Sequence, residues 1–323
     1  MSYSVTGKGV QYMRKKGDKI SIIGAGNVGA MVAQRILEHD LADVVLLDIE
    51  RGRCQGKVGD LCDAAPIMGY EKEVIGTSDY SMIRGSNIVV VTAGYPRTPG
   101  MSREDLLRKN ASIIRDVSLK IKEYEPGAIV IIITNPLDLM TYLTYKTTGF
   151  QRTKVLGMAG TLDSARFSNL AARELNITST EIESIVIGSH DTRMVPLLGH
   201  SKAQGKPLQE IFSPEKQRSL VEDTRNRGAY IVQLLKSGSA FFAPSAACFT
   251  MIKAILHNEH AILPVSVYLE GEYGFNDVCI GIPISLGKSG MEQIVELQLT
   301  DEETGQLNEA VEQLKKNIPS LTL

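Results

Sequence analysis

One stretch near the amino terminus restricts the possible folds more than any other part of the chain. An apolar run at residues 20–23 precedes helix-forming residues that continue to Leu37. Between them stand three glycines in the pattern G-x-G-x-x-G: Gly24, Gly26 and Gly29. This order predicts a strand, a tight turn and a helix. In such a unit the first glycine makes the turn, the second lets a phosphate approach the backbone, and the third lets the helix pack closely on the strand.

A carboxylate supplies the second half of a dinucleotide-binding signature. A further apolar run, residues 44–47, ends at Asp48, which follows Gly29 by about 20 residues, the usual spacing. A carboxylate here can accept hydrogen bonds from the adenine-ribose hydroxyls, and it would repel a 2′-phosphate. The sequence therefore predicts NAD as the cofactor. An ordinary strand-to-helix turn would account for the glycines but not for the acid.

The rest of the first half alternates strand-like runs with helical patterns. The predicted strands are residues 20–23, 44–47, 87–92, 128–134 and 154–156. Such alternation is typical of parallel strands joined by crossover helices, so we expect an α/β fold with a doubly wound Rossmann sheet. Ligands of these sheets bind at the carboxyl ends of the strands. The segments that leave those ends are therefore the places to search for chemistry.

After Gly157 the pattern changes to shorter strands and long helices, which predicts a mixed α+β domain. The predicted strands are 182–188, 194–198, 262–269, 278–286 and 294–297, and the predicted helices are 214–236, 244–257 and 301–316. We divide the chain into an N-terminal tail at 1–18, an NAD-binding domain at 19–157 and a catalytic, substrate-binding domain at 158–323. For the basic tail we expect frayed chain, with a short mitochondrial presequence as the alternative.

Composition argues against several classes of partner. A formal charge of −2 over 323 residues gives no bulk attraction to nucleic acid or to an anionic membrane. No apolar run approaches the ~20 residues that span a bilayer. The four cysteines have no metal-ligand spacing, so we expect neither a metal site nor disulfides, and reduced thiols fit a cytoplasmic location. These cysteines are Cys54, Cys62, Cys248 and Cys279.

The segment after residues 87–92 is the most unusual of those that leave a strand end. It carries Arg97 and Arg103 among two prolines and two glycines, and Arg103 lies at the start of a predicted helix that ends near Tyr124. We expect the loop at residues 94–103 to close over a bound substrate, because two arginines there are useful only when water is excluded.

Four more polar residues are candidates for the site. Asn135 follows the next predicted strand, and it either caps a helix or orients a substrate oxygen. Asp163 and Arg166 share a helix face, which on spacing alone indicates only a surface ion pair. His190 follows a strand end on a tight turn, where an imidazole can serve as general acid and base. A carboxylate on its second nitrogen would fix the tautomer, and Asp163 is the candidate.

Together these motifs resemble the lactate/malate dehydrogenase family, and most of all the malate dehydrogenases of its lactate-dehydrogenase-like subgroup. The resemblance covers most of the chain. It rests on the glycine motif with Asp48 and on segments 96–103, 134–136, 158–167 and 188–197. It implies reversible NAD-dependent oxidation of (S)-malate to oxaloacetate, an enzyme of the tricarboxylic acid cycle, with a small dicarboxylate as substrate. It also implies a homodimer or homotetramer.

The resemblance gives each candidate a role. His190 would exchange the hydroxyl proton, with Asp163 behind it. Arg166 would bind the carboxylate beside the reacting carbon, and Arg103 would polarise the carbonyl. Arg97 occupies the position where arginine favours a second carboxylate and glutamine favours the methyl group of pyruvate. Asn135 would lie near substrate and nicotinamide. We assign the cofactor to Gly24, Gly26, Asn27, Val28, Gly29, Asp48, Thr92, Ala93, Gly94, Asn110, Thr134 and Asn135.

Several alternatives remain at this point. L-lactate dehydrogenase is the nearest, and Arg97 argues against it because a methyl group would leave the arginine unpaired. Tyr142 and Lys146 have the spacing of a short-chain reductase pair, although that class has another glycine pattern. A catalytically inactive NAD(H)-sensing protein would keep the glycines but has no use for His190. One departure concerns the histidine turn: Asp191 stands where the family usually has glycine, and its Cβ would strain a backbone of positive φ.

Overall fold

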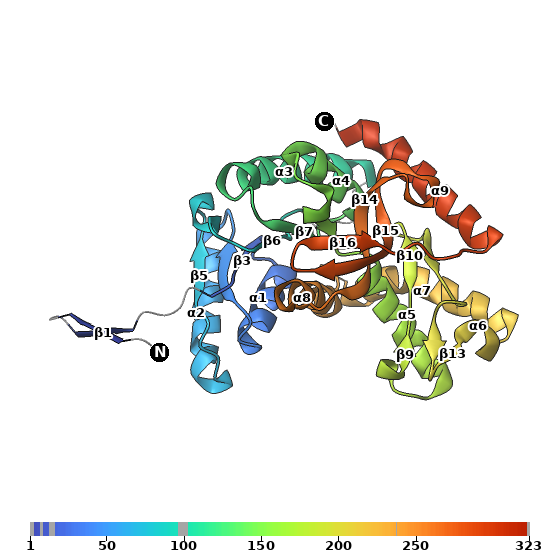
Figure 1. Ribbon diagram of the computed structural model, residues 1–323, viewed down its shortest axis with the longest axis horizontal. Coiled ribbons are helices and arrows are strands. Elements are labelled where there is room, and N and C mark those ends of the chain that lie inside the picture. Colours follow the sequence, from blue (N-terminus) through green and yellow to red (C-terminus); the bar gives the residue numbers. More distant parts are fainter. Residues whose placement is uncertain (1–2, 7–8, 13–16, 96–102, 237, 322–323) are drawn as a thin grey trace.

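The dominant feature of the molecule is one large mixed sheet. The computed structural model describes residues 3–6, 9–12, 17–95, 103–236 and 238–321 (Figure 1). Over these residues eleven strands join in the order β11-β10-β15-β14-β8-β7-β6-β3-β4-β5, with β16 beside β15. The sheet therefore runs without interruption from the glycine-rich first half of the chain into the second half.

The first half supplies the parallel part of this sheet. Its strands are β3 (Lys19–Ile23), β4 (Asp43–Leu47), β5 (Val74–Thr77), β6 (Ile88–Val91), β7 (Ile129–Ile132) and β8 (Val155–Gly157). Strand β3 pairs with β4 on one side and with β6 on the other, so the strand order reverses there. A reversal of this kind opens a crevice at the carboxyl ends of the two strands, where dinucleotides bind.

Helices cover both faces of the parallel part. They are α1 (Asn27–Glu38), α2 (Arg51–Met68), α3 (Arg103–Tyr124) and α4 (Leu137–Thr148), with short 3-10 turns η1 (Tyr80–Ile83) and η2 (Arg152–Lys154). Figure 1 shows α3 and α4 on one side of the sheet and α1 with the later helix α8 on the other. The doubly wound Rossmann arrangement expected from the sequence is confirmed.

The second half continues the sheet with antiparallel strands. These are β10 (Val186–Gly188), β11 (Met194–Pro196), β14 (Ala261–Glu270), β15 (Asn276–Gly287) and β16 (Gly290–Ile294). Ser266 of β14 pairs with Gly157 of β8 and also with Gly281 of β15, and Gly281 in turn pairs with Gly188 of β10. This row of four residues crosses from one half to the other, and it fixes the position of the turn that begins after Gly188.

The row has room for few side chains. A Cβ at Gly157 would lie 2.4 Å from the Thr141 hydroxyl, and one at Gly281 would lie 2.9 Å from the Gly188 carbonyl. Close packing at these two positions therefore requires glycine. The remaining elements of the second half are α5 (Gly160–Leu175), α6 (Leu208–Ile211), α7 (Pro214–Leu235), α8 (Phe242–His257), α9 (Asp301–Asn317), η3 (Ser179–Glu181), η4 (Glu272–Gly274), η5 (Ile318–Leu321), and a small sheet of β9 (Ile182–Glu183), β12 (Lys202–Ala203) and β13 (Lys206–Pro207).

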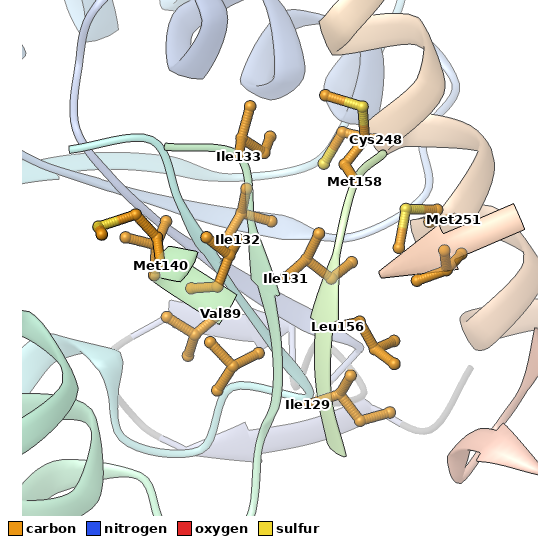
Figure 2. Packing of buried hydrophobic residues seen from close by; sticks show 14 of the residues in the cluster. Val89, Ile129, Ile131, Ile132, Ile133, Met140, Leu156, Met158, Cys248 and Met251 are labelled. Atoms are coloured by element: carbon orange, nitrogen blue, oxygen red, sulfur yellow. The ribbon is translucent and has the colours of Figure 1, made fainter. Parts of the chain in front are cut away.

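One apolar core spans both halves. In Figure 2, Ile131 of β7 lies beside Leu156 of β8, and Met158 lies next to Cys248 of α8. All of these side chains are at most 2% exposed. Because the core crosses from one half to the other, burial of α8 stabilises the parallel sheet as well as the second half. A second, smaller cluster gathers around Phe167 of α5.

Two sequence predictions in the second half are wrong. The run 182–188 is not one strand, because it divides into β9 and β10, which belong to different sheets. The run 294–297 is not a strand either, since β16 ends at Ile294. The Tyr273 hydroxyl accepts from the Leu297 N–H and donates to the Val295 carbonyl, so a side chain satisfies backbone groups that a strand partner would otherwise bind.

The N-terminal residues also differ from the expected frayed tail. Strands β1 (Tyr3–Thr6) and β2 (Gly9–Tyr12) pair as an antiparallel hairpin. Figure 1 shows this hairpin away from the body of the molecule. Among the described helices, none is both long and apolar enough to cross a membrane.

Candidate active site

The glycine turn after β3 has the shape of a phosphate site. Gly24 has φ +112°, and a Cβ there would lie 2.6 Å from the Thr92 hydroxyl. A Cβ at Gly29 would lie 2.0 Å from the Gly24 carbonyl oxygen. By contrast, nothing lies within 4 Å of a Cβ built on Gly26, the N-cap of α1, and no side chain caps this helix. The N–H groups of its first turn, at Asn27 and beyond, thus face open space that suits a pyrophosphate.

Asp48 is fixed beside this turn at the carboxyl end of β4. One carboxylate oxygen accepts a hydrogen bond from the Ala25 N–H at 2.6 Å, and the other accepts from the Glu50 N–H at 3.0 Å. The side chain is only half-buried, so each oxygen has a further lone pair available to a ribose hydroxyl. This geometry fits the adenosine end of NAD.

Hydrogen bonds join the loops that follow β6 and β7. Asn110 of α3 is 1% exposed; its carbonyl oxygen accepts from the Tyr95 N–H at 2.8 Å, and its amide donates to the Asn135 carbonyl at 2.7 Å. The Thr134 hydroxyl donates to the Ala93 carbonyl at 2.7 Å. Asn110 therefore holds the loops after β6 and β7 together, and its side-chain amide is occupied by hydrogen bonds within the protein.

The remaining predicted cofactor residues lie just after β6 or in the first turn of α1. The Thr92 hydroxyl donates to the Gly24 carbonyl at 2.8 Å, which joins the ends of β6 and β3. Val28 lies in the first turn of α1. A Cβ at Gly94 would lie 2.6 Å from a methyl group of Thr134, so the loop needs glycine at this close approach.

Asn135 does not cap the helix that follows it. Pro136, joined to Asn135 by a cis peptide bond, is the N-cap of α4, and no side chain caps this helix. The interpretation of Asn135 as a cap is therefore wrong. Its side chain is exposed and forms no hydrogen bond with any residue that the structure describes, so its amide is available to a ligand.

His190, Asp163 and Arg166 form one largely buried assembly. His190 Nδ1 lies 2.7 Å from one carboxylate oxygen of Asp163, and Arg166 Nη1 donates to the other at 3.1 Å. The Asp163 side chain is 1% exposed, so the interpretation of Asp163 and Arg166 as a surface ion pair is wrong. Burial lowers the pKa of His190, but the charge and hydrogen bond of Asp163 outweigh it, and the net pKa is raised above 6.5.

Sequence reasoning missed one charged residue, Asp138. This carboxylate, in the first turn of α4, is 3% exposed. One of its oxygens accepts from the His190 N–H at 2.8 Å and from the Ser189 hydroxyl at 3.2 Å, and the other accepts from the Ser266 hydroxyl at 2.7 Å. Burial raises its pKa to about 6. An acid in a first helical turn is common, so its spacing alone gave no signal.

Comparison with known proteins agrees with this arrangement. The family model for the lactate/malate dehydrogenase NAD-binding domain matches residues 18–157, and the model for the α/β C-terminal domain matches residues 160–322. The chain belongs to the lactate/malate dehydrogenase family. It is therefore an NAD-dependent oxidoreductase, which argues against the alternative of a catalytically inactive NAD(H)-sensing protein.

Relatives and solved structures of this dehydrogenase family resemble the chain over nearly its whole length. A malate dehydrogenase of Trichormus variabilis is 49% identical over 93% of both chains. The crystal structure of Cryptosporidium parvum malate dehydrogenase has a TM-score of 0.92 at 37% identity and covers 95% of this chain and 99% of its own. A lactate dehydrogenase from the same organism, complexed with lactic acid and NAD, also has a TM-score of 0.92 at 37% identity, covering 96% and 99%.

The histidine turn of this dehydrogenase is not strained at Asp191. The residue of positive φ is Gly188, at +91°, whereas Asp191 is not among the positive-φ residues, so the expectation of strain is wrong. The Asp191 carboxylate accepts from the Arg193 N–H at 2.8 Å and pairs with its guanidinium group. These contacts between residues of the same turn stabilise it.

Two predicted site residues cannot be placed. Arg97 lies outside the described residues, and Arg103 is the first residue of α3 with no described side chain. The loop at 94–103 is thus described only as far as Tyr95 and at Arg103.

Other sequence features prove to be structural. The Tyr142 hydroxyl donates to Asp277 at 2.9 Å, and Lys146 pairs with the same carboxylate at 2.7 Å. The pair therefore joins α4 to β15, and nothing in it supports a short-chain reductase. In the described part of the chain, no three His, Cys, Asp or Glu side chains gather in a way that could hold a metal ion.

Proposed function

We propose that the chain catalyses the reversible, NAD-dependent interconversion of (S)-malate and oxaloacetate. The observation that carries the proposal is the largely buried assembly of His190, Asp163 and Arg166 in a chain with an NAD-binding sheet. Relatives named malate dehydrogenase, 49% identical over most of the chain in one case, support the choice of substrate. Bound NAD supplies the hydride acceptor or donor.

His190 moves the proton. Its Nδ1 faces Asp163, so Nε2 is the nitrogen available to the substrate oxygen. Reduction of oxaloacetate requires an imidazolium that donates from Nε2 as the hydride arrives, and oxidation of malate requires the neutral ring. Asp163 favours the imidazolium and fixes the tautomer, because it accepts the proton that remains on Nδ1.

Arg166 has donors to spare for a carboxylate. One of its terminal nitrogens binds Asp163, while its buried Nε has no hydrogen-bond partner among the described residues. An unpaired buried donor is costly unless a ligand satisfies it. A substrate carboxylate that accepts two parallel hydrogen bonds from the guanidinium fork would do so. We assign to Arg166 the carboxylate next to the reacting carbon, which malate and lactate share.

Arg97 and Arg103 complete the substrate site in this proposal. Arg103 polarises the carbonyl, and Arg97 binds the second carboxylate, which oxaloacetate has and pyruvate lacks. Asn135 orients the substrate oxygen with its exposed amide. The roles of both arginines rest on family resemblance and on their positions in the sequence.

Side-by-side assays of NADH oxidation with oxaloacetate and with pyruvate test the substrate. We expect a preference for oxaloacetate of at least about a hundredfold in kcat/KM, since the second carboxylate gains two charge-assisted hydrogen bonds. The lactate dehydrogenase from Cryptosporidium parvum, with the same TM-score as its malate counterpart, makes lactate the second candidate. A preference for pyruvate would establish that second candidate and refute the first.

Cellular setting and assembly belong to the same proposal. We infer a cytoplasmic enzyme of the tricarboxylic acid cycle that works as a homodimer or homotetramer. Family resemblance supports the assembly, and the free cysteines support a reducing compartment; three of the four are buried and one is exposed. Sedimentation at micromolar concentration distinguishes a dimer from a tetramer, and a monomer that is fully active would contradict the assembly.

A further inference from the structure

A buried carboxylate from the cofactor half holds the turn that carries the catalytic histidine. Asp138 is 52 residues away from His190 in the sequence, yet its carboxylate accepts the His190 N–H at 2.8 Å. The same group accepts from Ser189 on that turn and from Ser266 on β14. One side chain of α4 therefore binds two segments of the second half, the turn after β10 and strand β14.

Asp138 also lies close in the sequence to Asn135, a proposed substrate-binding residue. Asn135, whose amide is open to a ligand, precedes Asp138 by three residues, so one turn of chain presents both groups. The Asn110 amide of α3 donates a hydrogen bond to the Asn135 carbonyl at 2.7 Å. A shift of this short segment would move the substrate-facing amide and the histidine turn together.

The contacts of Asp138 do not by themselves require a charge. An asparagine could accept from the His190 N–H with its oxygen and donate to the Ser266 hydroxyl with its amide, because a hydroxyl serves as donor or acceptor. Burial of an ionised carboxylate is unfavourable, and it raises the pKa of Asp138 to about 6. A neutral isostere would avoid this penalty, so the charge calls for a second reason.

The charged groups around His190 supply that reason. From α5, Asp163 raises and Arg166 lowers the pKa of the imidazole, and from α4 Asp138 raises it. On the turn itself, the carboxylate of Asp191 is paired with Arg193. Asp138 is thus the second carboxylate that favours the imidazolium, and it acts through space because its hydrogen bond is to the backbone.

We propose that Asp138 is a positioning residue of the reaction, whose carboxylate holds the His190 turn and favours the protonated imidazole that oxaloacetate reduction requires. The proposal rests on the role proposed for His190. It assigns two separable effects to the Asp138 side chain. The hydrogen bonds determine where the His190 ring lies, and the charge affects the pH range over which the ring is protonated.

Substitution of Asp138 by asparagine tests the charge. D138N keeps the acceptor for the His190 N–H. At low pH, where His190 is protonated in both the variant and the unmodified enzyme, we therefore expect kcat for oxaloacetate to agree within about threefold. The midpoint of the pH profile should move to lower pH, because the carboxylate that favours the imidazolium is gone. NADH affinity should stay within about twofold, since the cofactor residues are untouched.

Substitution by alanine tests the hydrogen bonds. D138A leaves the His190 N–H and two hydroxyls without their acceptor, an effect that corresponds to a loss of roughly tenfold or more in kcat. KM for NADH should stay nearly unchanged in D138A. Thr141→Val is the matched control: Thr141 is buried one turn further along α4, and its hydroxyl donates to the Leu137 carbonyl. It should leave the pH midpoint unchanged.

An NMR titration of the His190 imidazole separates this inference from the proposed function, because it needs no turnover. We expect a lower midpoint in D138N than in the unmodified protein and in T141V. Equal midpoints in D138N and the unmodified protein overturn the inference, as does an equal shift in T141V. D138N decides the matter even if D138A fails to fold. If the unmodified enzyme does not reduce oxaloacetate, the proposed function fails instead, whatever the NMR midpoints are.

Discussion

At the scale of the residue, His190 has only one nitrogen free for chemistry. Asp163 occupies Nδ1, and the turn that carries the ring is fixed through its backbone N–H. The imidazole is therefore pre-oriented before any substrate binds, which is the condition for efficient proton transfer. The same arrangement makes the direction of catalysis depend on pH.

His190→Asn should reduce turnover by about a hundredfold to ten-thousandfold, the usual contribution of a general acid and base. In the unmodified enzyme, oxaloacetate reduction should decline as pH rises through the pKa of His190, and malate oxidation should increase over the same range. Asp163 places this range above 6.5, because the net pKa of the imidazole is raised. Steady-state kinetics in both directions measure it; turnover of the variant within tenfold of the original would remove His190 from the mechanism.

Asp138 should limit stability at neutral pH. Its pKa is raised from 3.8 to about 6, so the folded state holds this proton more tightly than the unfolded state between about pH 4 and 6. Stability therefore decreases as pH rises through that window and stays lower above it. The difference corresponds to roughly 3 kcal/mol. D138N should be more stable than the unmodified protein at pH 8, and the gain should vanish near pH 4. Chemical denaturation at both values measures it; an equal gain at both would assign the effect to packing.

Arg97 and Arg166 should respond differently to the same substitution. Arg97→Gln should lower kcat/KM for oxaloacetate at least about a hundredfold, because two charge-assisted hydrogen bonds are lost, and should improve it for pyruvate. Arg166→Gln should damage both substrates, since both carry the carboxylate that Arg166 is proposed to bind. Kinetics of the two variants with both substrates decide the assignment. An equal loss for both substrates in Arg97→Gln would show that Arg97 does not select between them.

At the scale of the element, we propose that the carboxylate at the end of β4 selects NAD over NADP. Hydrogen bonds from the Ala25 N–H and the Glu50 N–H hold the Asp48 carboxylate there, in the position from which it would repel a 2′-phosphate. We expect higher catalytic efficiency with NADH than with NADPH. Asp48→Ser combined with an arginine at Ile49 should relax the preference by removing the repulsion and adding a cation. Equal efficiency with both cofactors in the unmodified enzyme would contradict this role.

The elements also show what a sequence can and cannot reveal. Strands β6 and β7 are buried at every position, so their unbroken aliphatic runs identified them. The run 294–297 alternates apolar residues with Glu296 in a strand-like way, but the Tyr273 side chain replaces its strand partner, a contact that no local pattern encodes. Likewise, spacing placed Asp163 and Arg166 on one helix face but could not tell that the face is buried. Asp138 escaped notice because its partners are 51 to 128 residues away.

At the scale of the whole molecule, the row of Gly157, Ser266, Gly281 and Gly188 connects the NAD-binding half to the half that carries His190. Gly281→Ala would place a Cβ 2.9 Å from the Gly188 carbonyl, two residues before His190. Such overpacking typically costs about 1–3 kcal/mol. We expect lower kcat and a lower melting temperature with nearly unchanged NADH affinity, measured by kinetics, calorimetry and fluorescence titration. Loss of NADH affinity in step with kcat would show that the disturbance spreads through the whole sheet.

The continuous sheet has a consequence for the recombination of family members. A chimera that joins the first half of one parent to the second half of another at Gly157 inherits a seam made of backbone pairing, glycine contacts and one buried carboxylate. Overall sequence identity between the two parents would then be a poor predictor of whether the chimera folds. What matters is whether both parents agree at a handful of seam positions, so two distant parents that share these positions should recombine more successfully than two close ones that do not.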